Sequence, residues 1–130
     1  MLVYQFPGQN LAATSISWTP TVTSSAGAIT SITYNRREAY RVGQLIYIHL
    51  DFTITNAGTG SGSLIFPPPV APLAGTFPTL LGRETAVAGD TLIAVLNPSG
   101  GGSFIGFRLN GTTSIATNRR NVFAGFYISS

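Results

Sequence analysis

The feature that most constrains the fold is a strict alternation of side chains between residues 44 and 55. One set of alternate positions is wholly apolar and consists of Ile46, Ile48, Leu50, Phe52 and Ile54. The other set mixes aromatic, polar and charged side chains and consists of Tyr47, His49, Asp51, Thr53 and Thr55. Because successive side chains of a strand point to opposite faces of a sheet, this segment has one apolar face and one mixed face. The alternation predicts a long central strand.

Strand signals also dominate the rest of the chain. Thr, Val, Ile, Phe and Tyr recur between Gly and Pro residues, and no segment places apolar residues at the helical period of 3.6. We expect further strands near residues 11–18 and 21–23, 28–34, 38–42, 63–66, 79–88, 91–96, 103–109 and 122–129. Roughly eight short strands separated by such turns predict an all-β fold, namely an antiparallel, jelly-roll-like β-sandwich.

Chain length and turn residues indicate how these strands are organised. A chain of 130 residues suits one domain, which we place at residues 11–130 after an N-terminal arm or linker at residues 1–10. Residues 67–69 are three prolines, which cannot donate ladder hydrogen bonds and therefore lie outside a sheet. Asn110-Gly111 follows an apolar run and indicates a hairpin turn.

The charge content excludes several classes of function. Seven Arg and no Lys give a net charge of +3, which is too thin and too scattered for a groove that binds nucleic acid. No apolar run approaches the roughly 20 residues of a membrane helix, and no signal peptide pattern follows Met1, so we expect no membrane insertion. Only 8% of the residues are charged against 44% that are hydrophobic, so we expect part of the surface to be covered by other subunits.

Catalytic chemistry has few residues to draw on. The chain has no Cys, and its one histidine, His49, projects from the same strand face as Asp51, about 7 Å away along the backbone. A Ser–His–Asp arrangement is conceivable, but a cross-strand polar pair or a subunit contact explains the two residues more simply. The four carboxylates are Glu38, Asp51, Glu84 and Asp90. We expect ion pairs for Glu38, which follows Arg36-Arg37, and for Glu84, which follows Arg83. We therefore expect no catalytic residue, no metal site and no cofactor.

The arginines are the better candidates for ligand binding. Asn35-Arg36-Arg37 and Asn118-Arg119-Arg120-Asn121 each place an Arg pair beside asparagine in segments that we expect to be loops. Guanidinium groups bind carboxylate or phosphate, and asparagine amides bind sugar hydroxyls, so an anionic glycan would suit these residues. Contacts between subunits or solubility explain the same arginines without a ligand. For the mixed face of the central strand, with Tyr47, His49 and Asp51, we predict a subunit interface.

Five segments together resemble a family of viral attachment domains. They are residues 17–21 (SWTPT), 40–43 (YRVG), the alternating strand, 64–69 (LIFPPP) and 123–128 (FAGFYI). In this order they resemble the C-terminal β-sandwich, the head or receptor-binding domain, of bacteriophage tail fibres and tailspikes. The resemblance implies that Gly43 permits the turn before the long strand and that Trp18 closes one end of the sandwich.

What the resemblance implies about function is a homotrimer at the distal end of a virion, made in the cytoplasm of a bacterial host. Such a domain attaches to the host surface, often to a glycan such as lipopolysaccharide or capsule, and carries out no catalysis. Three shallow sites on one fibre tip would gain avidity without any one of them being tight. The alternatives are a structural domain that trimerises or caps a fibre without its own ligand, and a small glycan hydrolase or esterase.

Overall fold

The computed structural model describes residues 12–97 and 102–130, which form nine strands and contain no helix. The strands are β1 (Thr14–Ile16), β2 (Thr23–Ala26), β3 (Ser31–Val42), β4 (Leu45–Asn56), β5 (Ser61–Phe66), β6 (Thr79–Glu84), β7 (Thr91–Leu96), β8 (Phe104–Arg108) and β9 (Arg120–Ile128). Every pairing is antiparallel, so the all-β antiparallel class is confirmed. The arm predicted at residues 1–10 lies outside the described residues.

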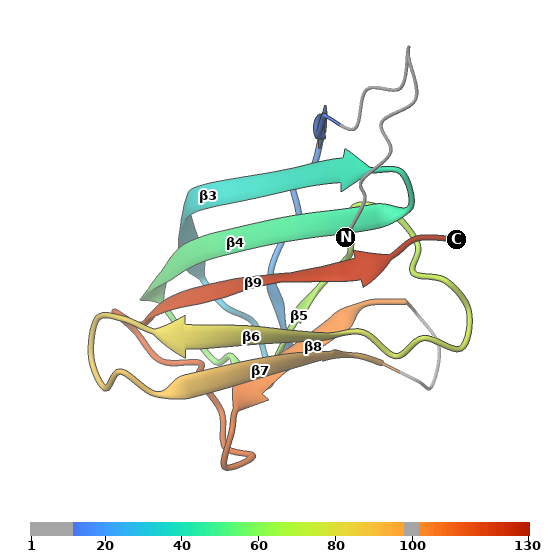
Figure 1. The fold of residues 1–130 in the computed structure, drawn as a ribbon. Helices are drawn as coiled ribbons and strands as arrows, with labels where there is room; N and C mark the ends of the chain where they lie inside the picture. Colours follow the sequence, from blue (N-terminus) through green and yellow to red (C-terminus); the bar gives the residue numbers. More distant parts are fainter. Residues whose placement is uncertain (1–11, 98–101) are drawn as a thin grey trace, which may run out of the picture.

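All nine strands belong to one hydrogen-bonded sheet. Their order is β1-β3-β4-β9-β6-β7-β8-β5-β2, and the sheet curls so that β5 and β8 pass behind β9 and β6 (Figure 1). The sequence predicted a jelly-roll-like sandwich of roughly eight strands; the strands form one curled sheet, and the sandwich stays a prediction. In the described part of the chain, no helix is long and apolar enough to cross a membrane.

The long hairpin of β3 and β4 differs from the prediction in one respect. Residues 28–34 and 38–42 were predicted as two strands with a loop between them, but residues 31–42 form one strand, β3, that pairs with β4 along its whole length. Asn35, Arg36 and Arg37 therefore lie within a strand, and the loop predicted for them was wrong. A β-bulge between Tyr34 and Arg36 takes up the extra residue, because pairing with a continuous neighbour outweighs the polar character of this segment.

The core lies on the inner face of the curled sheet. Ile46, Ile48, Leu50, Phe52 and Ile54 are all fully buried, as their alternation predicted. The curl brings Phe66 of β5 against Phe123 of β9, with ring centroids 5.5 Å apart. Space for the Phe123 ring comes from glycine: a Cβ on Gly106 would lie 2.8 Å from the Phe123 Cζ, closer than real side chains approach.

The sequence also led to expectations for Trp18 and for the turn at Asn110-Gly111. Trp18 is buried and its Nε1 donates a hydrogen bond to the carbonyl of Pro67, 3.0 Å away, which ties the first strands to the proline run outside the sheet. Asn110-Gly111 does form a turn, in which the Gly111 amide donates to the Arg108 carbonyl. The hairpin was wrong, however, because β8 pairs with β5 and β7, while β9 inserts between β4 and β6.

Candidate functional site

An aromatic cluster occupies the outer face of β3, β4 and β9. The register places Tyr47 opposite Tyr40 on one side and Phe126 on the other. Tyr47 stacks on Tyr40 at 6.4 Å between ring centroids and lies 5.0 Å from the Phe126 ring. The cluster borders an apolar hollow of about 280 Å³, lined by Ala13, Tyr40, Val42, Leu45, Tyr47 and Phe126. Phe126 is 61% exposed, which is unusual for a large apolar side chain.

The apolar surface continues from this cluster across β9 to β6. Alternation along β9 turns Phe126, Ala124 and Val122 to the outer face, and Ala124 lies opposite Leu81 of β6. Leu81 is 66% exposed and borders a second open hollow, together with Val122 and Ala124. We call the outward side chains Tyr40, Val42, Leu45, Tyr47, Leu81, Val122, Ala124, Phe126 and Ile128 the outer patch. It contains Tyr47 of the predicted interface.

Asp51 brings the two predicted Arg–Asn motifs together. Its carboxylate accepts hydrogen bonds from Arg120 Nε at 2.9 Å and Nη2 at 2.6 Å, and from Asn35 Nδ2 at 3.1 Å. The Arg120 hydrogen bonds outweigh the effect of burial and hold the pKa of Asp51 below its ordinary value. The hydrogen bonds of the Asp51 carboxylate go to Arg120 and Asn35, and none joins it to the half-buried His49.

The remaining residues of the two motifs lie apart from one another. Arg36 pairs with Glu38 at 3.5 Å, and the Arg37 guanidinium lies 4.2 Å from the centroid of the Tyr34 ring. In the second motif, the side chain of Arg119 turns to Asp90, while Asn121 is fully buried and accepts a hydrogen bond from Ser114. Asn118 occupies a turn with φ of 71°. The seven predicted residues therefore do not form a single site, and ligand binding by them stays a prediction.

Glu84 is fully buried, and its partner is the backbone. The ion pair predicted with Arg83 was wrong: the carboxylate accepts hydrogen bonds from the amides of residues 86–89, at 2.6 to 3.1 Å. Burial alone would raise the pKa of Glu84, but these four amides outweigh burial and lower it to about 2. Glu84 therefore stays ionised and closes the loop between β6 and β7.

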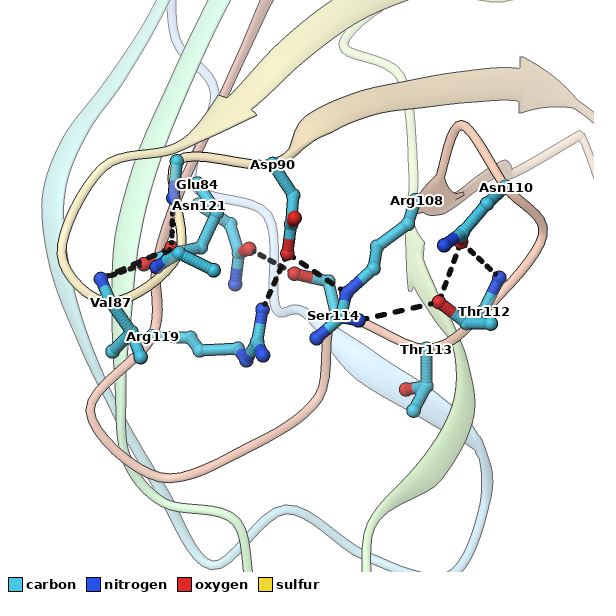
Figure 2. A network of polar contacts seen from close by, with 12 residues as sticks. Glu84, Val87, Asp90, Arg108, Asn110, Thr112, Thr113, Ser114, Arg119 and Asn121 are labelled. Carbon is cyan, nitrogen blue, oxygen red and sulfur yellow. Dashed lines mark hydrogen bonds and ion pairs between the residues drawn. The ribbon is translucent and has the colours of Figure 1, made fainter.

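A polar pocket lies beside that loop, at the ends of β7 and β8. It has a volume of about 440 Å³ and is lined by Asp90, Thr91, Arg108, Leu109 and Asn110. Figure 2 shows Asp90 between two arginines, with its Oδ2 3.1 Å from Arg108 Nε and 3.1 Å from Arg119 Nη1. Sequence reasoning missed this grouping, because Arg108 stands alone in an apolar segment and Asn110 carried only a turn signal.

Comparisons with known proteins leave the family undecided. No family model, curated protein or solved structure matches the chain. The described residues also contain no group of three or more His, Cys, Asp or Glu side chains that could hold a metal ion. Any functional conclusion must therefore come from the outer patch, the Asp51 and Glu84 contacts and the polar pocket.

Proposed function

We propose that this chain is a non-enzymatic receptor-binding domain of a bacteriophage tail fibre or tailspike, which acts as a homotrimer and binds glycan on the host surface. The observation that carries the proposal is the outer patch, an apolar and aromatic face on the outside of a small domain. Contiguous apolar patches of this kind are typical of protein–protein interfaces. The sequence resemblance supplies the link to phage fibres.

Self-association is the part of the proposal that the patch supports most directly. Phe126, Leu81 and Ile128 are 61, 66 and 46% exposed, and they project from the neighbouring strands β9 and β6. Burying apolar surface contributes about 25 cal/mol per Å², so covering three such side chains favours association by several kcal/mol. A chain with 8% charged residues also has few charges that would oppose such contacts.

The arrangement of titratable groups supports recognition over catalysis. Asp51, Glu84 and Asp90 are each held by arginine or by backbone amides, and Glu38 pairs with Arg36. A general acid or base needs a carboxylate or histidine that can exchange a proton near neutral pH. The lowered pKa values of Asp51 and Glu84 make these two carboxylates poor candidates for that role.

A structural domain that caps or trimerises a fibre without a ligand is the second candidate. The outer patch favours it equally, because an interface by itself needs no receptor. Binding to host cells separates the two: a trimer that labels no strain in a broad bacterial panel would overturn the receptor-binding proposal and leave the capping role.

The assembly itself is tested with two matched variants. Phe126→Glu places a charge in the outer patch, whereas Phe77→Glu places the same charge at a phenylalanine of similar exposure, 67%, outside the strands. Light scattering should give three times the chain mass for the wild type and for Phe77→Glu, and the mass of one chain for Phe126→Glu. A monomeric wild type, or equal masses for the two variants, would contradict assembly through the patch.

A further inference from the structure

We infer that the polar pocket at the ends of β7 and β8 binds an anionic group carried by a saccharide, with Arg108 as the residue that grips it. This inference rests on the proposed function, since it names where and what kind of glycan the domain recognises. The anionic group is a carboxylate, as in uronic acids, or a phosphate. Both present oxygens in the geometry that a guanidinium fork binds.

The pocket is built on the ends of paired strands. Arg108 ends β8 and lies next to β7, where its register partner is Leu92. The Leu109 amide donates to the Thr91 carbonyl at 3.0 Å, and the Arg108 amide donates to the Thr112 carbonyl at 2.9 Å. These hydrogen bonds fix the turn that carries Asn110. A site on strand ends needs little ordering when a ligand arrives, which favours binding.

The charges around the pocket favour an anion. Two guanidinium groups, those of Arg108 and Arg119, share one carboxylate, so the cluster has a net charge of +1. Both ion pairs meet at the same oxygen of Asp90. Arg119 is further from solvent than Arg108, with side-chain exposures of 12 and 24%. Arg108 is therefore the arginine that a ligand in the pocket can reach.

Two contacts hold the Arg108 guanidinium group in place and leave one of its nitrogens available to a ligand. Its Nε faces Asp90, and its Nη1 donates to the Thr112 hydroxyl at 3.4 Å (Figure 2). Among the described residues its Nη2 makes no hydrogen bond, and its buried Nε, although 3.1 Å from Asp90, is not aligned for one. A ligand oxygen in the pocket would be an acceptor for Nη2, whereas the buried Nε stays directed at Asp90.

The other lining residues suit the rest of a sugar ring. The Asn110 Oδ1 accepts hydrogen bonds from the amide and the hydroxyl of Thr112, which turns its Nδ2 donors away from that contact. Leu109 is 64% exposed and offers an apolar surface for the C–H face of a ring. An amide donor, a carboxylate acceptor and an apolar surface within one shallow pocket are the groups that sugar hydroxyls and ring faces require.

The test compares variants of the assembled protein in calorimetric binding to three oligosaccharides of equal length. One carries uronic acids, one carries phosphate groups, and one is neutral. Arg108→Gln should weaken binding of the anionic probe about tenfold or more, because a charge-assisted hydrogen bond is lost. Arg41→Gln, which removes the same charge from the other hairpin of the sheet, should bind as the wild type does. The affinities for the two anionic probes show whether the pocket prefers a carboxylate or a phosphate.

A second pair of variants keeps the test independent of folding. Leu109 is exposed, so Leu109→Glu and Leu109→Lys both leave the core intact and both remove the apolar contact. Leu109→Glu should weaken anion binding more than Leu109→Lys does, by about fivefold or more for a like charge placed beside the ligand. Equal affinities for the two variants would overturn the role of charge in this pocket.

Each outcome separates the inference from the proposed function. Binding of an anionic probe that survives Arg108→Gln overturns the pocket and leaves receptor binding intact. Equal affinity for the neutral probe overturns the anionic specificity. If the wild type labels host cells but binds neither anionic probe, the inference fails and the proposed function stands. If it labels no cells and binds no probe, both fail.

Discussion

The inner and outer faces of β9 differ in exposure although their sequences are alike. Both faces of this strand carry apolar or aromatic side chains at alternate positions. Phe123 on the inner face is fully buried, whereas Phe126 on the outer face, three residues later, is 61% exposed. The inner face is covered because the sheet curls back on itself, and the outer face has no such cover from the described strands. Alternation therefore assigns side chains to a face, and the path of the sheet decides which face is buried.

The largest difference between the two faces should appear on removing an aromatic ring. Phe123→Ala leaves a cavity among Phe66, Gly82 and Gly106, and we expect it to lower the free energy of unfolding by about 3–5 kcal/mol. Urea denaturation followed by circular dichroism measures this loss. If Phe123→Ala cost as little stability as Phe126→Ser on the outer face, the two faces would not differ in burial as described.

Glu84 tests whether a charge on the inner face stabilises the fold. Because its pKa is about 2 in the folded protein and 4.5 ordinarily, the unfolded chain binds more protons between these pH values. The stabilisation is therefore complete above pH 4.5 and is lost as the pH falls to 2, by about 3 kcal/mol in total. Unfolding measured from pH 2 to 7 should show this slope.

The substitution Glu84→Gln should remove most of that pH dependence and lower stability at neutral pH. Glu38→Gln is the matched control, since it removes the same charge from an ion pair on the outer face. We expect the control to cost less than about 1 kcal/mol. If the Glu84→Gln variant kept the full pH dependence of stability, that dependence would come from other carboxylates.

The space reserved for Phe123 gives a third test of the inner face. A methyl group on Gly106 would lie 2.8 Å from the ring and 3.5 Å from Leu64 Cβ. Gly106→Ala should therefore cost roughly 1–3 kcal/mol through overpacking. Gly43→Ala is an informative comparison, because nothing lies within 4 Å of its added Cβ and its cost comes only from its φ of 59°. A double variant with Phe123→Leu should recover part of the Gly106→Ala loss; no recovery would contradict a clash with this ring.

On the outer face, the polar contact of Asp51 should matter less than these packing effects. Asp51→Asn removes the charge that orients Arg120, and we expect a loss of roughly 1–2 kcal/mol for its hydrogen bonds. Since its pKa lies below the ordinary 3.8, the contribution is present above that pH and disappears as the pH falls through the folded value. Thermal unfolding at pH 7 and at a series of lower pH values measures both effects, and a variant as stable as the wild type at pH 7 would contradict a stabilising role of this contact.

The smallest effect is expected for Phe126→Ser in the isolated chain. Exposed side chains away from special contacts change stability by about 0.5 kcal/mol or less. Unfolding is measured at a protein concentration low enough for light scattering to give the mass of one chain. The stability of Phe77→Ser, measured in the same way, is the reference. A cost of several kcal/mol for Phe126→Ser would mean that its ring is part of the core in solution.

Parts of the candidate site could be predicted and parts could not. Tyr47, His49 and Asp51 share one face as the alternation predicted, and Gly43 has the positive φ that its turn requires. The contact of Arg120 with Asp51 had no local signal, since the two residues are 69 positions apart in the chain. The same holds for Arg108 and Asp90, which meet only because β7 pairs with β8.

The sequence by itself determined the all-β class, the inward side chains of the central strand and the turns at Gly43 and Asn110-Gly111. These are local properties, because the period of a strand and the φ of a glycine depend on neighbouring residues alone. Only the tertiary structure decided that β9 lies between β4 and β6, that the sheet curls over Phe123, and that two arginines share Asp90. These depend on pairing between distant strands, whose choice rests on the packing of the whole sheet and not on any one segment.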